Sequence, residues 1–374
     1  MSPRNSLMML PARRLRCVGD LGPVFLWLHK AEPAFDRGSR PLPAGGIRMS
    51  PMSGHSALPV LETPTQRPRV IPAGRAYVRV SITDRCNLRC RYCMPEQGVQ
   101  LSARREHADI DEHIEAIARL DEQVGVRKIR ITGGEPLVRK DVVELVRRIR
   151  ERFAGAELCM TTNAVLLDRF AQQLADAGLD RVNISIDSLR RDRFEDITRR
   201  DDLSAVLRGI DAAFKAGLGP VKFNAVLLRA LNLDEYPELV RFAVDCGGTM
   251  RFIELMEIGE SGYDHSAAFV SADEAFSKID EVYPSRWLEG LHGVARPALV
   301  TIDGVEHEVG FIRPVTEPFC STCDRMRVDT LGRVHSCLMG EDPQEADIAA
   351  NLFADKTEPT WSWRRVASMS SIGG

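Results

Sequence analysis

The sequence has little of what marks a membrane or nucleic-acid-binding protein. Its best apolar run in 374 residues spans only residues 24–28, far below the roughly 18 residues that a membrane-spanning helix needs. Its net charge of -3 is small, so there is no global basic signature of nucleic-acid binding. With 44% hydrophobic and 28% charged residues, the chain is not collagen-like, coiled-coil or wholly disordered. We expect a globular protein with no membrane and no nucleic-acid partner.

The average charge hides an uneven chain. Residues 1–75 carry 11 basic and four acidic residues, a net charge of +7, whereas the remainder has a net charge of -10. The same stretch holds 11 of the 21 prolines, which disfavour helices and strands. We therefore predict a disordered N-terminal extension over residues 1–75. Its arginine bias allows an organellar leader, and an early start, with Met49 or Met52 as the true first residue, is an equal alternative.

The sequence also lacks a compact secretory signal. A disulfide framework is typical of short secreted chains, so we expect a cytoplasmic protein whose nine cysteines are reduced. Six of them fall in two tight groups, which favours metal or cluster ligands. Cys159 and Cys246 stand in apolar contexts and are predicted to be inert core residues.

Short β-branched runs alternate with amphipathic helical stretches from Tyr77 to about Leu255. This alternation is typical of βαβ units around a parallel sheet. Six such units are too few for an eight-stranded barrel, so an open partial barrel or a doubly wound sheet is expected. In a barrel, functional residues gather at the carboxyl ends of the strands. The predicted strands are 77–83, 128–132, 157–162, 181–187, 221–227 and 250–255, and the helices are 109–124, 139–153, 167–177, 203–217 and 235–246.

The pattern changes after residue 256. Strand-like pieces at 298–302, 307–312, 326–329 and 334–335 come close together, with glycine turns between them. Closely spaced strands joined by such turns predict antiparallel pairing. We therefore divide the chain into an extension (1–75), a barrel (76–256), a small antiparallel β module (257–340) and a weakly structured tail (341–374).

The first cysteine group is Cys86, Cys90 and Cys93, spaced C-x3-C-x2-C after the first predicted strand. Three thiolates on one short loop can hold three corners of a four-iron, four-sulfur (4Fe-4S) cluster and leave one iron open for a small molecule. A zinc site with His107 as a distant fourth ligand is an alternative, although structural zinc prefers four ligands at C-x2-C spacing. Scattered structural cysteines are a third interpretation.

A glycine pair ends the second predicted strand, in Thr132-Gly133-Gly134-Glu135-Pro136. Glycines let backbone approach a ligand closely where a side chain would block it, and Glu135 can anchor neighbouring loops. Alone, such a turn is more often a plain strand exit. Behind a C-x3-C-x2-C loop it is a strong signal of a binding site.

The second cysteine group is Cys320, Cys323 and Cys337, spaced C-x2-C-x13-C. It again offers three cysteines rather than four. A second cluster with an open iron is one interpretation, and a zinc ribbon with His335 as the fourth ligand is the other.

Alternation along a strand indicates which face three of the basic residues share. Arg325 and Arg327 alternate on one face, and same-side guanidinium groups suit a polyphosphate. Lys222 shares a face with Asn224 by the same alternation. A solvated basic edge is the alternative in both cases.

The cysteine loop with Tyr92 before its last cysteine, followed by Gly-Gly-Glu-Pro, resembles the radical S-adenosylmethionine (SAM) superfamily. The resemblance implies a partial (β/α)6 TIM-like barrel, an α/β fold. It also implies a first 4Fe-4S cluster that cleaves SAM, so that the resulting deoxyadenosyl radical takes hydrogen from a substrate.

Within that superfamily the chain resembles the GTP 3',8-cyclases of molybdenum cofactor biosynthesis. The resemblance covers about residues 76–337 and the terminal Gly373-Gly374. It implies a lyase that closes a ring between ribose C3' and guanine C8 of GTP, with a second 4Fe-4S cluster in the C-terminal module. The local matches are Ser81-Ile82-Thr83-Asp84-Arg85-Cys86-Asn87, Tyr92-Cys93-Met94-Pro95 and Arg130-Ile131-Thr132-Gly133-Gly134-Glu135-Pro136.

The resemblance also implies roles for individual residues. The two cysteine groups would hold the two clusters. The SAM contacts would be Tyr92, Gly134, Ser185 and Met256. The GTP contacts would be Arg79, Arg130, Thr161, Lys222, Arg325 and Arg327. Asp187 and Asn224 are plausible supporting groups without a firm role.

Implied partners are GTP, an electron donor of flavodoxin or ferredoxin type and a downstream pterin synthase, and the resemblance allows a homodimer. Two departures stand out: the tail after Leu338 lacks the family's usual basic helix, and Ala164 replaces a common glycine. The alternatives are another two-cluster radical SAM enzyme acting on a peptide, and a non-catalytic metal-binding scaffold.

Overall fold

The computed structural model describes Ile71 and residues 74–98, 107–257 and 263–335. Almost all of the predicted extension lies outside these residues. Cys337 and the predicted tail with Gly373 and Gly374 lie outside them as well.

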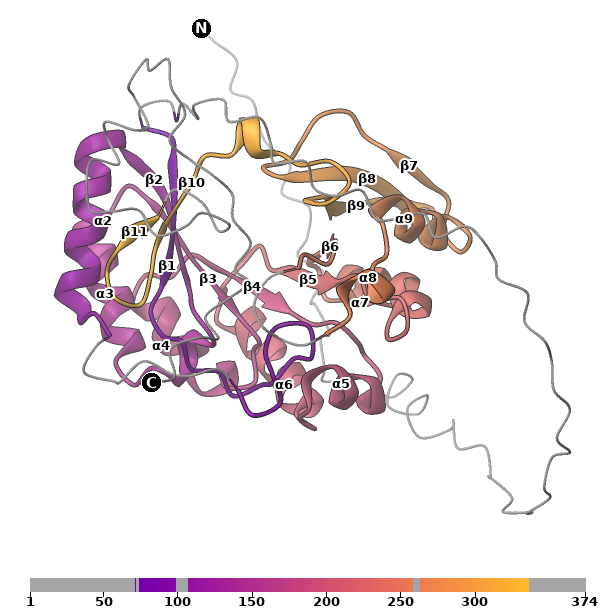
Figure 1. Cartoon of the computed structure of the whole chain (residues 1–374), viewed down its shortest axis with the longest axis horizontal. Coiled ribbons are helices and arrows are strands. Elements are labelled where there is room, and N and C mark those ends of the chain that lie inside the picture. Colours follow the sequence, from indigo (N-terminus) through magenta and orange to yellow (C-terminus); the bar gives the residue numbers. More distant parts are fainter. Residues whose placement is uncertain (1–70, 72–73, 99–106, 258–262, 336–374) are drawn as a thin grey trace, which may run out of the picture.

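Six parallel strands alternate with helices in the first two thirds of the described chain, as predicted (Figure 1). Their neighbours pair in chain order from β1 to β6. The strands are β1 (Ala76–Ser81), β2 (Val126–Thr132), β3 (Glu157–Thr162), β4 (Arg181–Ser185), β5 (Lys222–Val226) and β6 (Thr249–Ile253). The helices between them are α2 (Ile110–Val124), α3 (Val142–Arg152), α4 (Leu167–Asp176), α5 (Arg191–Thr198), α6 (Leu203–Lys215) and α7 (Tyr236–Asp245), with 3-10 turns η2 (Pro136–Val138) and η3 (Leu233–Glu235).

Local chemistry explains where these helices begin and end. At the start of α2, Asp109 and Glu112 form a capping box, each side chain accepting from the other's backbone N–H, which satisfies two donors left open by the first turn. Gly178 and Gly217 follow α4 and α6 with positive φ, a conformation that glycine adopts without strain.

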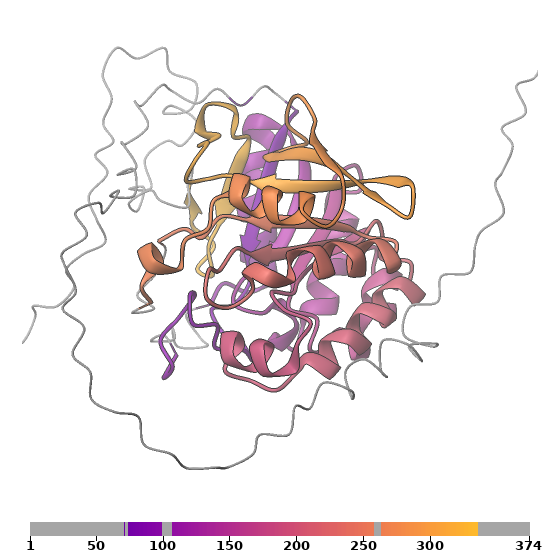
Figure 2. The same ribbon diagram turned by 90° about the vertical axis from the view of Figure 1, so that its right-hand side faces the viewer.

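The two faces of the sheet differ in chemistry. Alternate residues such as Val78, Ile129, Met160, Ile184 and Phe223 are fully buried in the hydrophobic core, and the helices pack on this outer face (Figures 1 and 2). The other alternate positions carry polar and charged side chains. Because side chains alternate between the two faces of a strand, the outer face is apolar and packs against the helices. The inner face is polar and can form a binding site.

The C-terminal strands join the same sheet at both of its edges. The order is β11-β10-β1-β2-β3-β4-β5-β6-β9-β8-β7. The antiparallel strands predicted there are present, as β8 (Ala295–Ile302) and β9 (Val305–Ile312) beyond β6, and as β10 (Arg325–Val328) with β11 (Val334–His335). A further strand that was not predicted, β7 (Ser285–Trp287), pairs with β8. The α/β fold class with C-terminal antiparallel strands is confirmed.

Two pairings differ from a separate antiparallel module. β10 runs parallel to β1, and β9 runs parallel to β6. Figure 1 shows yellow β10 beside indigo β1, with orange β7, β8 and β9 at the far edge. Residues 313–324, which contain the short turn η4 (Cys320–Thr322), connect these two edges.

Two further helices, α8 (His265–Ala268) and α9 (Ala272–Asp280), lead from β6 to β7. None of the helices in the described residues is long and apolar enough to cross a membrane.

Candidate functional site

The first cysteine group lies on a loop after β1, at the carboxyl end of the parallel strands. The loop coils tightly, because the N–H groups of Cys93 and Met94 both donate to the carbonyl of Cys90. The N–H of Leu88 donates to the Cys86 sulfur at 3.4 Å. None of these three cysteines forms a disulfide. The chain thus presents three thiols together on one short loop.

Helix α5 supports this loop and was not predicted from the sequence. The N–H groups of Arg89 and Arg91 donate to the carbonyls of Thr198 and Ile197 at the end of the helix, each at 2.9 Å. The guanidinium of Arg199 donates back to the carbonyl of Arg89. The thiols are therefore held from outside the loop as well as from within it.

The two glycines, Gly133 and Gly134, lie in close contact with another segment of the protein's own backbone. A Cβ atom at Gly134 would lie 2.2 Å from the carbonyl oxygen of Arg85, and one at Gly133 would lie 2.4 Å from that of Thr83. The N–H of Gly134 donates to the Thr83 carbonyl at 2.7 Å. The two glycines therefore let the segment that leads into the cysteine loop lie directly against the end of β2.

Glu135 ties this corner together, as predicted for an anchor of neighbouring loops. Its carboxylate accepts hydrogen bonds from the Leu137 N–H, the Thr162 hydroxyl and the Asn163 N–H. The Asn163 side chain in turn donates to Asn87 in the cysteine loop at 2.8 Å. The carboxyl ends of β2 and β3 are thereby linked to the thiols.

Negative charge accumulates at this end of the barrel. Burial raises the pKa of Glu135 to about 7 and that of Asp187 to about 6. Burial, with the charges of Glu135 and Cys93, raises the pKa of the Cys86 thiol to about 11. Burial and the Asp187 charge also raise the pKa values of Cys90 and Cys93. A metal cation in place of the thiol protons would remove this repulsion, so the donor set fits an iron–sulfur cluster.

Tyr92 is tied to the end of β4. Its hydroxyl donates to Asp187 at 2.7 Å, and the other oxygen of that carboxylate accepts from the Val226 N–H at 2.8 Å. The predicted SAM contact Ser185 is the last residue of β4 and pairs in register with Asn224. Asp187 and Asn224, which lacked a firm role in the sequence, thus lie beside two predicted SAM contacts.

The inner face of the sheet carries basic side chains in adjacent strands. Across β10, β1 and β2, Arg327 pairs in register with Arg79 and Arg79 with Arg130. Two residues earlier on the same strands, Arg325 pairs with Tyr77 and Tyr77 with Lys128. Further along the sheet the face continues with Arg181, Lys222 and Arg251. We call these eight basic side chains the interior cations: Arg79, Lys128, Arg130, Arg181, Lys222, Arg251, Arg325 and Arg327.

The interior cations lower one another's pKa values across the barrel. Burial lowers the pKa of Arg79 to about 10, assisted by the charges of Arg327, Arg325 and Arg130. Burial lowers the pKa of Arg251 to about 10, assisted by Arg130 and Arg181. Because β2 and β6 lie four positions apart in the sheet, this coupling requires the sheet to curve around a shared interior. The charged forms are under repulsion that an anion would relieve.

Several interior polar atoms have no partner among the described residues. They are Nε of Arg79, Nε of Arg130 and Oδ1 of Asn224, and all three are buried. Burying a donor without a partner costs about 1–3 kcal/mol, so a ligand is the natural partner. Arg130 also donates to the hydroxyl of Thr161 at 3.2 Å, which joins two predicted GTP contacts.

The sequence reasoning missed four charged residues that point into the barrel: Lys128, Arg181, Arg251 and Glu157. Lys128, Arg181 and Arg251 alternate with apolar residues on predicted strands, the same signal that identified Lys222. Glu157 lies between two of them: burial alone would raise its pKa, but bonding to Lys128 and the charge of Arg181 lower it to about 2. The Tyr77 ring lies 5.3 Å from Lys128 Nζ and 5.6 Å from the Arg130 guanidinium.

Part of the second cysteine group is described. Cys320 begins the η4 turn and Cys323 directly follows it, and the Cys323 N–H closes the turn by donating to the Cys320 carbonyl at 3.3 Å. Arg325 follows at the start of β10, where its guanidinium stacks on the Phe319 ring at 5.4 Å. Since β10 is parallel to β1, this turn lies toward the amino end of β1, and the first cysteine group lies past its carboxyl end. The interior cations lie between the two groups.

The strand-end rule holds for four predicted contacts. Ser185 ends β4 and Thr161 is the last residue but one of β3. Gly134 and Met256 follow the ends of β2 and β6 by two and three residues. All four thus lie at the end of the barrel that bears the first cysteine group, whereas Arg325 and Arg327 lie on the added strand β10.

The two zinc alternatives would use His107 and His335 as fourth ligands. Among the described residues, no group of three or more His, Cys, Asp or Glu side chains is placed to hold one metal ion, and this applies to the three thiols of the first cysteine group as well. His107 pairs with Asp84 at 3.2 Å and His335 with Asp329 at 2.9 Å.

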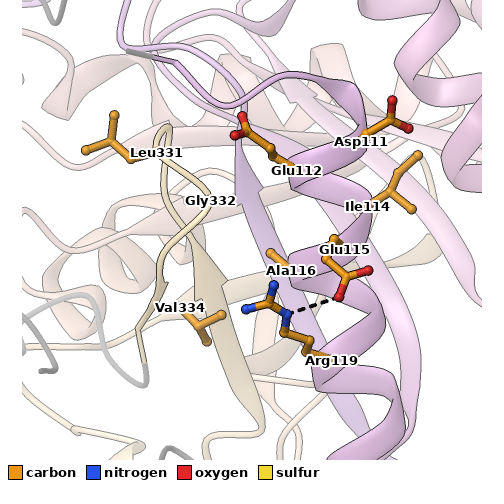
Figure 3. Close-up of a pocket in the computed structure, with 9 residues that line it drawn as sticks. All are labelled: Asp111, Glu112, Ile114, Glu115, Ala116, Arg119, Leu331, Gly332 and Val334. Carbon is orange, nitrogen blue, oxygen red and sulfur yellow. Dashed lines mark hydrogen bonds and ion pairs between the residues drawn. The ribbon is translucent and has the colours of Figure 1, made fainter. Parts of the chain in front are cut away.

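A groove of about 520 Å³ lies between α2 and the turn that joins β10 to β11 (Figure 3). Ile114, Leu331 and Val334 provide its apolar walls, and Glu115 pairs with Arg119 along its helical side. No predicted site residue lines this groove, so it is separate from the barrel interior.

Comparisons with known proteins agree with this arrangement. The family model described as Radical SAM superfamily matches residues 80–243, and the one described as Molybdenum Cofactor Synthesis C matches residues 248–360. The chain is 44% identical to GTP 3',8-cyclase of Alkaliphilus metalliredigens over 318 residues, which cover 80% of this chain and 97% of that protein. It is 40% identical to GTP 3',8-cyclase of Moorella thermoacetica over 317 residues, with the same coverage.

Among solved structures, the chain resembles Streptococcus suis SuiB bound to S-adenosylmethionine, with a TM-score of 0.52 and 13% sequence identity. The match covers 77% of this chain and 66% of SuiB, slightly less than two thirds of that protein. At this identity the likeness concerns the fold alone, and it agrees with the curved parallel sheet described above.

Proposed function

The chain belongs to the GTP 3',8-cyclase family of the radical SAM superfamily, and from that membership we propose that it cyclises GTP. The reaction joins ribose C3' to guanine C8 and yields (8S)-3',8-cyclo-7,8-dihydroguanosine 5'-triphosphate. This is the first step of molybdenum cofactor biosynthesis. The protein is a radical SAM enzyme of the lyase type.

The cofactors of the family are two 4Fe-4S clusters and SAM. When bound, the first cluster and SAM supply the one-electron chemistry that removes hydrogen from the substrate. The chain's own residues bind, orient and shield the reactants. We propose that Cys86, Cys90 and Cys93 hold the first cluster, and that Cys320 and Cys323, with Cys337 outside the described residues, hold the second.

The observation that carries the proposal is the buried set of interior cations between the two cysteine groups. Arg79 and Arg130 each leave a buried Nε without a partner among the described residues, and burial with mutual repulsion lowers the pKa of Lys222 to about 8. A triphosphate would supply both acceptors and opposite charge. A peptide substrate, the main alternative, would leave most of these charges unbalanced.

The roles of single residues follow from this position. We assign the triphosphate to Arg79, Arg130, Thr161, Lys222, Arg325 and Arg327. We assign SAM to the carboxyl end of the strands, at Tyr92, Gly134, Ser185 and Met256. Since the hydroxyl of Tyr92 is bonded to Asp187, its remaining contact surface is its ring and backbone.

The proposal includes partners that match this chemistry. The first cluster needs an electron donor of flavodoxin or ferredoxin type, and the product passes to a pterin synthase. Free cysteines suit a reducing compartment such as the cytoplasm. A homodimer is part of the proposal as well.

An anaerobic assay tests the function. Reconstituted protein, with about eight iron atoms per chain, is mixed with SAM, a strong reductant and GTP, and 5'-deoxyadenosine is measured together with the cyclised nucleotide. We expect deoxyadenosine release to depend on GTP. GMP, which lacks two phosphates, should support about tenfold less at equal concentration, because it forms fewer contacts with the interior cations.

Two results would overturn the proposal. Deoxyadenosine release that is the same with and without GTP would exclude GTP as the substrate. A protein that binds zinc and no iron after reconstitution would support the metal-binding scaffold instead.

A further inference from the structure

Glu254 is a buried carboxylate that none of the assignments above uses. It follows the last residue of β6, and its backbone N–H donates to the Ile312 carbonyl at the end of β9. Only 1% of its surface is exposed. It therefore lies where the sheet ends and the connection to β10 begins.

Four hydrogen-bond donors converge on this carboxylate. One oxygen accepts from the Ala272 N–H at 3.0 Å and the Thr316 hydroxyl at 2.5 Å. The other accepts from the N–H groups of Val315 and Thr316, at 3.1 and 2.9 Å. A carboxylate has about four acceptor sites, so all are filled, and all of the donors are neutral.

Arg313 holds the same stretch from the other side. Its Nε donates to the Thr316 hydroxyl at 3.2 Å, and its guanidinium pairs with Asp273 and Glu317. The N–H of Glu317 donates back to the Arg313 carbonyl at 3.0 Å. Residues 313–317 are thus fixed by their own turn, by Arg313 and by Glu254.

This fixed stretch leads directly into the second cysteine group. Cys320 comes four residues after Thr316, and Arg325 and Arg327 follow on β10. Between β9 and Cys320, the direction of the chain is set by the bonds of Glu254 and Arg313. A change in that direction would displace both cysteines and both arginines together.

We propose that Glu254 is a positioning residue for the substrate half of the site. Its carboxylate aims the connection from β9 to β10 so that Cys320 and Cys323 hold the second cluster beside the interior cations. The inference rests on the proposed function, because it concerns the cluster and the GTP contacts of that same site.

Glu254→Gln tests the proposal. The amide keeps one acceptor oxygen but turns an NH2 group toward backbone N–H donors, so at least one bond is lost and one repulsive contact is gained. We expect amide exchange at Val315 and Thr316 to accelerate about tenfold. Bound iron should fall from about eight to about four atoms per chain. The affinity for GTP should fall about tenfold.

The end of the barrel that bears the first cysteine group provides an internal control for the Glu254→Gln variant. SAM affinity, measured without GTP, should stay within about twofold of the unmodified protein, because the Glu254 carboxylate bonds to Ala272, Val315 and Thr316 and not to the first cysteine group. Glu235→Gln is the control: Glu235 is equally buried and accepts from Ser188, Leu189 and Arg193 instead. It should leave exchange at Val315 and Thr316 unchanged.

Thr316→Val provides a milder second variant, since it removes the bonds of the Thr316 hydroxyl to Glu254 and Arg313 and keeps the carboxylate. We expect about a threefold loss of GTP affinity with faster exchange at Val315. If Glu254→Gln fails to fold, this variant decides, and unchanged exchange and GTP affinity in it overturn the proposal. Full iron and GTP affinity in Glu254→Gln overturn it as well.

The readouts separate this inference from the proposed function. Iron content and amide exchange need no turnover. If the unmodified protein fails to cyclise GTP but Glu254→Gln still loses four irons, only the proposed function fails. If GTP is cyclised and Glu254→Gln keeps its iron, exchange rates and GTP affinity, only the positioning role fails.

Discussion

The two halves of the barrel interior bury ionisable groups of opposite kinds, acidic in one half and basic in the other. At the end that bears the first cysteine group, burial raises the pKa values of Glu135, Asp187 and Cys86. Among the interior cations, burial and like charges lower the pKa values of Arg79 and Lys222. Each shift shows that the charged form of the group is disfavoured, and each half therefore favours a ligand that would stabilise that form by opposite charge.

The halves differ in how far they are organised in advance. The carboxylates of the thiol end already accept bonds from Leu137, Thr162, Asn163, Tyr92 and Val226. Among the interior cations, by contrast, buried guanidinium nitrogens lack partners in the described chain. The thiol end is therefore rigid before any ligand arrives, whereas the cationic half gains order and bonds when its anion binds. Damage to the two halves should have different consequences.

Removing a thiol should give the largest effect. Cys90→Ala deletes one of three ligands of the first cluster, so we expect GTP cyclisation to fall about a thousandfold or more. Iron should drop from about eight to about four atoms per chain. GTP affinity, measured by calorimetry under anaerobic conditions, should stay within about twofold. A parallel collapse of GTP binding would mean that the two halves are not separate.

Removing one guanidinium of the interior cations should have a smaller effect, which weakens GTP binding and leaves the iron content unchanged. Arg79→Met keeps the apolar stem but loses the charge, and we expect GTP affinity to fall about thirtyfold with both clusters intact. Without GTP, the free energy of unfolding should rise, because a buried repelling charge is gone. Urea denaturation checks this.

Arg208→Met is the control for that variant. Arg208 lies on the surface beside Asp168, with 59% of its side chain exposed. Its loss should change neither the affinity for GTP nor the free energy of unfolding. Lower stability in Arg79→Met without ligand would contradict the view that the interior cations repel one another.

The smallest expected effect is a pH dependence. The pKa of Lys222 is lowered to about 8 by burial and by Arg251, Arg181 and Lys128, with Glu308 opposing. Bound phosphate would raise that pKa, so at pH 8 GTP binding should take up about half a proton, measurable by calorimetry in buffers of different ionisation enthalpy. Lys222→Met should abolish this uptake.

The same group affects stability without ligand. Between the lowered pKa of about 8 and the ordinary value of 10.5, the unfolded chain binds more protons than the folded one. Stability should therefore rise with pH across that window. Subtracting the Lys222→Met profile isolates this contribution, and a fall over the same window would contradict the assignment.

The sequence predicted the barrel strands well because their patterns are local. The predicted strand 157–162 coincides with β3 and the predicted strand 128–132 lies within β2, since β2 alternates apolar and polar residues and β3 holds a short apolar run. Helix α5 was missed because its sequence, Arg-Asp-Arg-Phe-Glu-Asp-Ile-Thr, offers only a narrow apolar stripe. The parallel pairing of β10 with β1 was missed because residues some 250 positions apart give no local signal of their contact.

The residues of the candidate site also divide into those with a local sequence signal and those that only the fold brings together. Both cysteine groups and the glycine pair were recognisable from spacing alone. Lys128, Arg181 and Arg251 were visible as charged residues within strands, but only the register shows that they face the same interior as Arg79. The roles of the site residues remain predictions that the variants above test.

The late arrival of β10 has a consequence for how the protein is made. The 243 residues between the end of β1 and the start of β10 take about 12–50 s to synthesise at about 5–20 residues per second. Throughout that time one edge of β1 has no strand beside it, and exposed strand edges invite pairing with other chains. Newly made protein should therefore pass through an interval of vulnerability to aggregation, which ends when β10 docks and adds Arg325 and Arg327 to the interior cations in the same step.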